Sequence, residues 1–169
     1  RTPTIQDGKV MWRLAQESDG LEINSAYSYL LVCRHFADTC VIAEVEGQPV
    51  GFISAHRPPN DPKVVFVWQI GVSAKHHGKG IGGWMLDTLV RLPGCRDVRF
   101  LEATVTPSNT ASKAVFRGLA RHLEVECAES DCFDVDMFPL NAHESDGLSG
   151  AHEPERLFRI GPFSLARTH

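Results

Sequence analysis

Apolar and polar residues follow two different periods along the chain, and each change of period marks an element. Residues 66–72 are rich in β-branched and aromatic side chains, which is typical of a buried strand. From Gly80 to about Arg91 the apolar residues instead recur at the helical spacing of about 3.6. The expected inward face of this helix consists of Ile81, Met85, Leu86, Leu89 and Val90. A glycine-rich turn joins the two segments, so the sequence predicts strand, turn and helix in succession.

The same periods predict elements on both sides of this unit. Helices are expected at 9–17, at 24–37 with Asn24 or Ser25 as the N-cap, and at 109–123. Their expected inward positions are Val10, Trp12 and Leu14, then Ala26, Tyr29, Leu30, Cys33 and Phe36 or Ala37, and finally Ala111, Val115, Leu119 and His122 or Leu123. Strands are expected at 39–46 and 50–56 as a hairpin, and at 64–72, 98–106, 125–138 and 157–163, with a loop at 142–154. The order predicts a single α/β domain over residues 1–169, with helices on both faces of a mixed sheet.

The turn between strand and helix has a composition suited to binding phosphate. It reads His77-Gly78-Lys79-Gly80-Ile81-Gly82. Glycines at the start of a helix leave backbone N–H groups free to face an anion. The spacing lacks the Gly-x-x-x-x-Gly-Lys-Ser/Thr pattern of a mononucleotide loop and matches only the first part of the dinucleotide pattern. The turn therefore indicates another phosphate-containing ligand, and a glycine turn without a ligand is the alternative.

Composition and charge restrict the possible partners. Hydrophobic residues make up 43% of the 169 residues and the net charge is −4, without a basic run. This argues against a nucleic acid or a membrane surface as partner and is compatible with a small cationic substrate. The sequence shows neither a membrane span nor a secretory leader, so we expect a cytoplasmic protein. The odd number of cysteines, without Cys-x-x-Cys spacing, predicts reduced thiols and no metal site: Cys33, Cys40, Cys95, Cys127 and Cys132.

The turn resembles the acetyl-CoA pyrophosphate loop of the GNAT acetyltransferases, with Gly80 and Gly82 as its last two fixed positions and His77 where that family usually has Arg or Gln. Further segments resemble one branch, the L-2,4-diaminobutyrate acetyltransferases of ectoine biosynthesis, although that branch usually has Asp where this chain has Glu22. These segments span nearly the whole chain: Asp7-Gly8, 21–31, 50–52, Trp68-Gln69, 101–109, Ala111-Ser112, Phe116-Arg117, 152–155 and Arg159-Ile160.

The resemblance implies a fold, an activity and a cosubstrate. The fold would be the three-layer GNAT fold, with a mostly antiparallel sheet whose middle strands splay apart to admit the thioester. The activity would be transfer of acetyl from acetyl-CoA to the γ-amine of L-2,4-diaminobutyrate, giving the ectoine precursor of the osmotic stress response, in a homodimer. The implied cosubstrate-binding residues are Trp68, Gln69, Ile70, Gly71, Val72, His77, Gly78, Lys79, Gly80, Ile81, Gly82, Asn109, Ser112 and Phe116.

Acyl transfer to an amine requires the neutral amine, and an ammonium of pKa near 10.4 costs roughly 4–5 kcal/mol to neutralise at pH 7. A carboxylate or a chain of water molecules must accept the proton. In the fold that the resemblance implies, a backbone N–H within residues 70–72 would polarise the thioester carbonyl. The candidate acceptors are Glu155, Glu102, Glu153 and Glu22; the leading hypothesis is Glu155 together with His152, and Glu102 is a second catalytic candidate. The expected substrate-binding residues are Glu22, Asn24, Tyr27, Trp68, Thr104, His152, Glu153 and Glu155.

Phe116 stands where many GNAT enzymes have a Tyr that protonates the leaving thiolate, so a water molecule, Ser112 or an unassisted thiolate would replace that step. Two other functions remain open. One is acetylation of a different cationic amine, such as a polyamine, an aminoglycoside or a protein N-terminus. The other is a coenzyme A-binding protein without catalysis, which His77 and Phe116 would favour.

Overall fold

The computed structural model describes residues 1–18, 20–138 and 152–164. Its helices are α1 (Gly8–Glu17), α2 (Ala26–His35), α3 (Ile81–Arg91) and α4 (Thr110–His122). Its strands are β1 (Val41–Val45), β2 (Gln48–His56), β3 (Val64–Val72), β4 (Phe100–Val105), β5 (Cys127–Phe133) and β6 (Glu155–Ile160). None of the helices in these ranges is long and apolar enough to cross a membrane.

The strands form one mixed sheet in the order β1-β2-β3-β4-β6-β5. Its pairings are antiparallel except that between β3 and β4, which is parallel. That parallel pairing runs only from Val64 and Phe100 to Val67 and Ala103. Because β3 continues to Val72 and β4 to Val105, the two strands separate beyond the paired part. The sheet therefore has an opening in its middle, as the resemblance implied.

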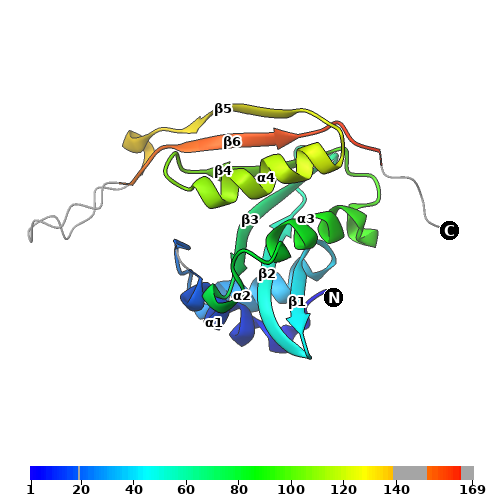
Figure 1. Cartoon of the computed structure of the whole chain (residues 1–169), viewed down its shortest axis with the longest axis vertical. Coiled ribbons are helices and arrows are strands. Elements are labelled where there is room, and N and C mark those ends of the chain that lie inside the picture. Colours follow the sequence, from blue (N-terminus) through cyan, green and yellow to red (C-terminus); the bar gives the residue numbers. More distant parts are fainter. Residues whose placement is uncertain (19, 139–151, 165–169) are drawn as a thin grey trace, which may run out of the picture.

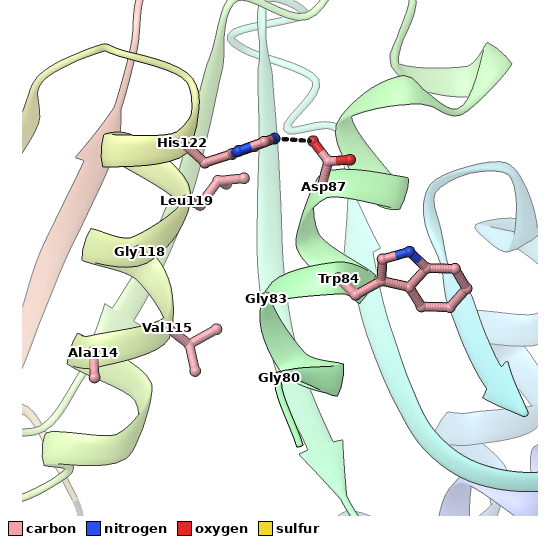
Figure 2. A pocket seen from close by; sticks show the side chains of 9 residues that line it. All are labelled: Gly80, Gly83, Trp84, Asp87, Ala114, Val115, Gly118, Leu119 and His122. Carbon is pink, nitrogen blue, oxygen red and sulfur yellow. Dashed lines mark ion pairs between the residues drawn. The ribbon is translucent and has the colours of Figure 1, made fainter. Parts of the chain in front are cut away.

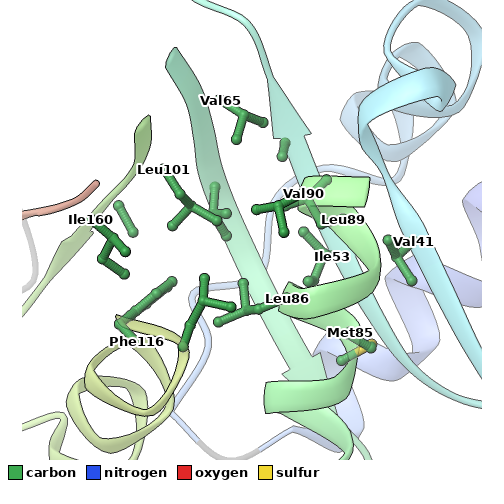
Figure 3. Close-up of a cluster of buried hydrophobic side chains, with 14 of the residues drawn as sticks. Val41, Ile53, Val65, Met85, Leu86, Leu89, Val90, Leu101, Phe116 and Ile160 are labelled. Atoms are coloured by element: carbon green, nitrogen blue, oxygen red, sulfur yellow. The ribbon is translucent and has the colours of Figure 1, made fainter. Parts of the chain in front are cut away.

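Helices cover both faces of the sheet, which gives three layers (Figure 1). Helices α1 and α2 pack on one face around a cluster that includes Leu14, Tyr29 and Phe52. Helices α3 and α4 cover the other face, where the larger cluster lies (Figure 3). In that cluster Leu86 and Leu89 of α3 meet strand residues such as Leu101. The inward face predicted for α3 is confirmed, since its residues are buried or half-buried.

A β-bulge interrupts β3 just where the strand approaches the opening. In the pairing with β2, Ser54 is opposite Gln69 and Ala55 is opposite Val67, so Trp68 has no partner. An extra residue reverses the alternation of side chains along a strand. Val67 before the bulge and Ile70 after it therefore both contact the cluster under α3. Consequently Gln69 turns toward the opposite layer, formed by α1 and α2, where it bonds Tyr29.

Some expectations about individual residues were wrong. Ala26 and Leu30 are exposed, and Val32 is buried together with Tyr29 and Cys33, because the buried side of α2 is rotated from the predicted stripe. Of the two alternatives at the end of this stripe, Phe36 is exposed and Ala37 is half-buried. Trp12 of α1 is 37% exposed, and Met11 is buried in its place. Ala111 of α4 is also exposed, whereas of the alternatives His122 and Leu123 it is Leu123 that packs against the larger cluster. Here Phe116, Leu119 and Ala120 form the buried face.

Element boundaries also differ from the predictions. Strand β1 begins only at Val41 because Ala37–Thr39 forms a 3₁₀ turn. Strand β5 ends at Phe133 and is followed by a second 3₁₀ turn, Val135–Met137, so the predicted strand at 125–138 was too long. Strand β6 begins at Glu155, two residues before the predicted start. Most of the loop predicted at 142–154 lies outside the described residues.

The five cysteines carry free thiols. Cys33, Cys40 and Cys95 are buried, whereas Cys127 and Cys132 are partly exposed. Burial raises the pKa of Cys33 to about 11 and the pKa values of Cys40 and Cys95 to about 12. All three thiols therefore stay protonated at neutral pH, as buried, inert cysteines do.

Candidate active site

Helix α3 begins without a capping side chain. Its N-cap is Gly80, at φ 75°, and no side chain accepts a hydrogen bond from the first turn. Gly78 also has a positive φ, of 73°, so the turn contains two left-handed positions that favour glycine. The first intrahelical bond of this turn runs from the Trp84 N–H to the Gly80 carbonyl, at 3.1 Å. Within residues 1–18, 20–138 and 152–164 the N–H groups of residues 81–83 have no hydrogen-bond acceptor, so they can face an anion, and the helix dipole adds to the attraction.

Two histidines in the turn have different surroundings. His77 Nε2 lies 2.8 Å from the Val72 carbonyl oxygen, so the ring ties the turn to the end of β3. His76, which the sequence analysis did not single out, has a buried Nδ1 with no partner among the described residues. Lys79, in the same turn, is exposed. Because His76 and His77 are adjacent in a turn, their sequence positions do not indicate which of the two rings faces inward.

Three adjoining hollows run from this turn through the opening in the sheet. The first, the loop cleft, holds about 370 Å³ between the turn, the end of β3 and the start of α4. The second, the strand cleft, holds about 310 Å³ where β3 and β4 separate. The third, the aromatic cavity, holds about 560 Å³ beside α2 and the end of β5. Neighbouring hollows are adjacent, because they share lining residues: Gly20, Leu21, Ile70, Asn109 and Ser112 for the first pair, and Glu22, Trp68, Thr104, His152 and Glu155 for the second.

A fourth hollow, the helix groove, holds about 570 Å³ between α3 and α4 (Figure 2). It shares Gly80, Gly83 and Val115 with the loop cleft, so it extends that cleft along the two helices. At its far end His122 Nε2 lies 3.3 Å from an Asp87 carboxylate oxygen, which links the helices (Figure 2). This groove was not expected from the sequence, because it exists only where the two helices, which are far apart in the chain, lie side by side.

The four candidate carboxylates have different partners. Glu102 forms an ion pair with Arg159 across β4 and β6. Glu153 accepts hydrogen bonds from the Ser108 N–H, at 3.0 Å, and from the Ser108 hydroxyl. Glu155 has one carboxylate oxygen, Oε2, that is buried and has no partner among the described residues. Glu22 is exposed at the rim. A buried oxygen without a partner at the wall of two hollows is a site for an external donor.

Several effects act on the acidity of Glu155. Burial raises its pKa above the ordinary range, and the hydroxyl of Thr104 and the nearby His152 partly offset that rise. The charges of Glu22 and Glu153 raise the pKa further. The carboxylate is therefore more basic than an exposed one, and a bound cation would relieve the repulsion. His152 Nδ1 lies 2.7 Å from the Glu153 carbonyl and its ring stacks on Phe138, with centroids 3.6 Å apart.

The other predicted site residues are distributed unevenly. Trp68, 47% exposed, lines the strand cleft and the aromatic cavity, and Asn24 and Thr104 also line the strand cleft. Tyr27 is 67% exposed and lines none of the four hollows. Asn109 caps α4, where its Oδ1 accepts from the Ser112 N–H at 3.0 Å. Predicted residues that line the loop cleft or the strand cleft are Gln69, Ile70, Gly71, Val72, His77, Gly78, Gly80, Ile81, Gly82, Asn109, Ser112 and Phe116.

Aromatic residues of the third hollow were not expected from the sequence. The ring centroid of His56 lies 5.8 Å from that of Phe36 and 5.6 Å from that of Phe66. Burial lowers the pKa of His56, so its imidazole is neutral at pH 7. Phe133 and Phe138 complete the aromatic lining. The sequence did not indicate this aromatic cavity because its residues lie far from any motif and far from one another, on β2 and β3 and after α2 and near or beyond the end of β5. In residues 1–18, 20–138 and 152–164 no group of three His, Cys, Asp or Glu could hold a metal ion.

Comparison with known proteins agrees with this geometry. Residues 9–120 match the acetyltransferase (GNAT) family. The chain therefore belongs to that family.

Its relatives within the family include the L-2,4-diaminobutyric acid acetyltransferase of Shouchella clausii, 44% identical over 160 residues, with 95% of this chain and 84% of the relative covered. The enzyme of that name from Streptomyces coelicolor is 39% identical, with 96% and 91% covered. A solved diaminobutyrate acetyltransferase from Paenibacillus lautus, in complex with L-2,4-diaminobutyric acid and coenzyme A, has a TM-score of 0.88, 41% identity and coverage of 99% and 96%. The ribosomal-protein-S18-alanine N-acetyltransferase from Escherichia coli shares the fold, with a TM-score of 0.68 at 14% identity.

Proposed function

We propose that this protein transfers acetyl from acetyl-CoA to the γ-amine of L-2,4-diaminobutyrate. The observation that carries the proposal is the buried Oε2 of Glu155, which has no partner in the described part of the chain and lies where the strand cleft meets the aromatic cavity. One hollow leads from it toward the free N–H groups of α3, and the other is lined by aromatic rings and carboxylates, which suit an ammonium. The relatives named for this activity cover nearly the whole chain, which supports the choice of substrate.

The residues present fit coenzyme A. The N–H groups at the start of α3 would receive the pyrophosphate, and the helix groove would take the nucleotide end. The opening between β3 and β4 would admit the pantetheine arm, because no strand pairing blocks it there. Gly71 lines the loop cleft, and a Cβ there would lie 2.8 Å from both Leu21 and Phe52, so a larger residue would push the strand out of place. Backbone N–H groups of β3 would then polarise the thioester carbonyl.

Glu155 is the proposed general base. Glu102 and Glu153 are committed to Arg159 and Ser108, so they are less available to take a proton from the substrate. Burial makes Glu155 a stronger base than an exposed carboxylate, which suits proton transfer near neutral pH. Glu22, at the rim of the same hollow, would pair with the second ammonium of the diamine, and Trp68 would face it through its ring.

We also propose that residues 1–169 form one acetyltransferase domain acting in the cytoplasm on the ectoine pathway during osmotic stress. A homodimer is part of the proposal. It is supported by exposed apolar side chains beyond the end of β5, where Val135 and Met137 are 48% and 64% exposed. Sedimentation velocity at micromolar concentration should show a species of twice the chain mass, and a monomer throughout would contradict it.

A substrate panel tests the activity. Coenzyme A release, followed with a thiol reagent, should be fast with 2,4-diaminobutyrate and much slower with ornithine, lysine and spermidine. NMR of the product should place the acetyl group on the γ-nitrogen. Comparable rates on all four amines would keep the class of enzyme and reject the substrate. Coenzyme A binding without turnover on any of them would indicate a binding protein instead.

A further inference from the structure

The side chain of Gln69 lies inside the protein rather than in the loop cleft. It is 6% exposed and sits between α2 and the segment 20–25, which joins α1 to α2. The Tyr29 hydroxyl donates to Gln69 Oε1 at 3.0 Å, and Gln69 Nε2 donates to the Glu22 carbonyl at 2.7 Å. A buried chain of two hydrogen bonds thus runs from a helix, through a strand, to the backbone of a residue at the rim of the site.

The two bonds fix the orientation of the Gln69 amide. Its oxygen must face the donor of Tyr29, and its NH₂ must face the carbonyl of Glu22, since a carbonyl can only accept. The reversed amide would set two acceptors against each other at Glu22. The bulge at Trp68 is what turns Gln69 toward this layer. Without the extra residue, Gln69 would share the direction of Val67 and face α3.

The segment that Gln69 holds has no helix or strand of its own between Leu21 and Ser25. Ser18 secures its beginning, because its hydroxyl contacts the carbonyls of Leu14, at 2.7 Å, and Val72, at 3.2 Å. Ser25 caps α2 at its end. Between these two points the Gln69 amide is the side chain that bonds the backbone at Glu22.

The Glu22 carboxylate lies at the rim of the proposed amine-binding site, where its charge can act on a bound cation and on Glu155. It lines the strand cleft and the aromatic cavity together with Glu155. Its charge also contributes to the raised pKa of Glu155, in keeping with their shared position at the wall of both hollows. A shift of the Glu22 backbone would change the spacing between these two carboxylates.

We propose that Gln69 and Tyr29 are positioning residues, which hold the Glu22 backbone so that its carboxylate meets the second ammonium of the diamine while Glu155 meets the first. This inference rests on the proposed function for its catalytic readout. It assigns to Gln69 a role in placing the amine substrate through Glu22, distinct from any contact with coenzyme A.

The test compares Gln69→Leu and Tyr29→Phe with Ser54→Ala. Ser54 is the matched control, because it lies opposite Gln69 on β2 and its buried hydroxyl has no partner among the described residues. Gln69→Leu should raise KM for 2,4-diaminobutyrate about tenfold, since small misplacements of binding groups have effects of this size or larger. Tyr29→Phe should have a smaller effect because it keeps the bond to Glu22. The Kd for coenzyme A should stay unchanged in both, and Ser54→Ala should match wild type.

A double-mutant cycle with Glu22→Gln separates positioning from general damage. If Gln69 acts through Glu22, adding Gln69→Leu to Glu22→Gln should cost little further activity. Fully additive losses, or an equal loss in coenzyme A affinity, would overturn the inference.

Amide hydrogen exchange gives a readout independent of catalysis. Exchange in residues 20–25 should be faster in Gln69→Leu than in wild type and unchanged in Ser54→Ala. A wild-type protein that fails to acetylate 2,4-diaminobutyrate would refute the proposed function. Faster exchange in Gln69→Leu would still support the anchor, that is, the hydrogen bond by which Gln69 holds the Glu22 backbone. Unchanged exchange would refute the anchor even in an active enzyme.

Discussion

Replacing Glu155 by glutamine is expected to lower kcat/KM for 2,4-diaminobutyrate by about 10²–10⁴-fold, the usual contribution of a general base. Glutamine keeps the shape but cannot accept the proton of the ammonium. The wild-type profile of kcat/KM against pH should show an acid limb above the ordinary carboxylate range, because burial raises the pKa of Glu155. That limb should disappear in the variant.

Glu153→Gln is the matched control for this experiment. Its carboxylate is two residues away and is held by Ser108, so the variant should retain most of the activity. The acid limb should persist but move to lower pH, because the charge of Glu153 contributes to the raised pKa of Glu155. Loss of activity in Glu153→Gln, with little change in Glu155→Gln, would show that Glu155 is not the general base.

Glu155→Gln should not weaken the fold. A carboxyl with a raised pKa holds its proton more tightly in the folded than in the unfolded state, so its ionisation costs stability as pH rises from its ordinary pKa through its raised one. At neutral pH Glu155→Gln should therefore unfold at the wild-type Tm or above it, and the difference should vanish in acid. A lower Tm at pH 7 would mean that the ionised carboxylate has a stabilising partner.

Replacing Gly80 by alanine is expected to raise KM for acetyl-CoA about tenfold. The left-handed backbone at φ 75° costs a residue with a Cβ roughly 1–2 kcal/mol, although nothing lies within 4 Å of the added atom. Relaxation of that strain would move the N–H groups at the start of α3 away from the pyrophosphate. Isothermal titration with coenzyme A and initial rates at varied acetyl-CoA would measure the effect.

Gly47 offers a control with the same conformation. It lies in the hairpin between β1 and β2 at φ 74°, also with open space around the missing Cβ. Gly47→Ala should lower Tm by a similar amount while leaving KM for acetyl-CoA unchanged. Equal changes in KM for both variants would show that general destabilisation, not the loop, causes the effect.

The sequence was sufficient to predict the strand, turn and helix from β3 to α3. The spacing of apolar residues changes there from that of a strand to that of a helix, and the glycines of the turn are closely spaced. The sequence could not reveal the bulge at Trp68, which exists only in the pairing of β3 with β2. The resemblance placed Gln69 beside the cosubstrate, and the residue does line the strand cleft, but the bond from its side chain to Tyr29 could not be foreseen. The error for Ala26 and Leu30 has a similar origin, since packing against α1 decides which stripe of α2 is buried.

The candidate base shows the same limit more clearly. Among the four glutamates the resemblance favoured Glu155, but only contacts between distant segments give a physical reason for that choice. Arg159 is 57 residues from Glu102, and Ser108 is 45 residues from Glu153. The family resemblance indicated the region 152–155, but the partners, and the oxygen of Glu155 without one, belong to the folded chain.

The free thiols bear on how the enzyme can be measured and handled. A thiolate, not a thiol, attacks disulfide reagents and alkylating agents. The burial that raises the pKa of Cys33, Cys40 and Cys95 should therefore make them slow to react while the protein is folded. A colour reagent for thiols should then count the coenzyme A released, with a small background from Cys127 and Cys132. The same inertness should let the folded enzyme tolerate oxidising conditions that would inactivate an exposed low-pKa cysteine.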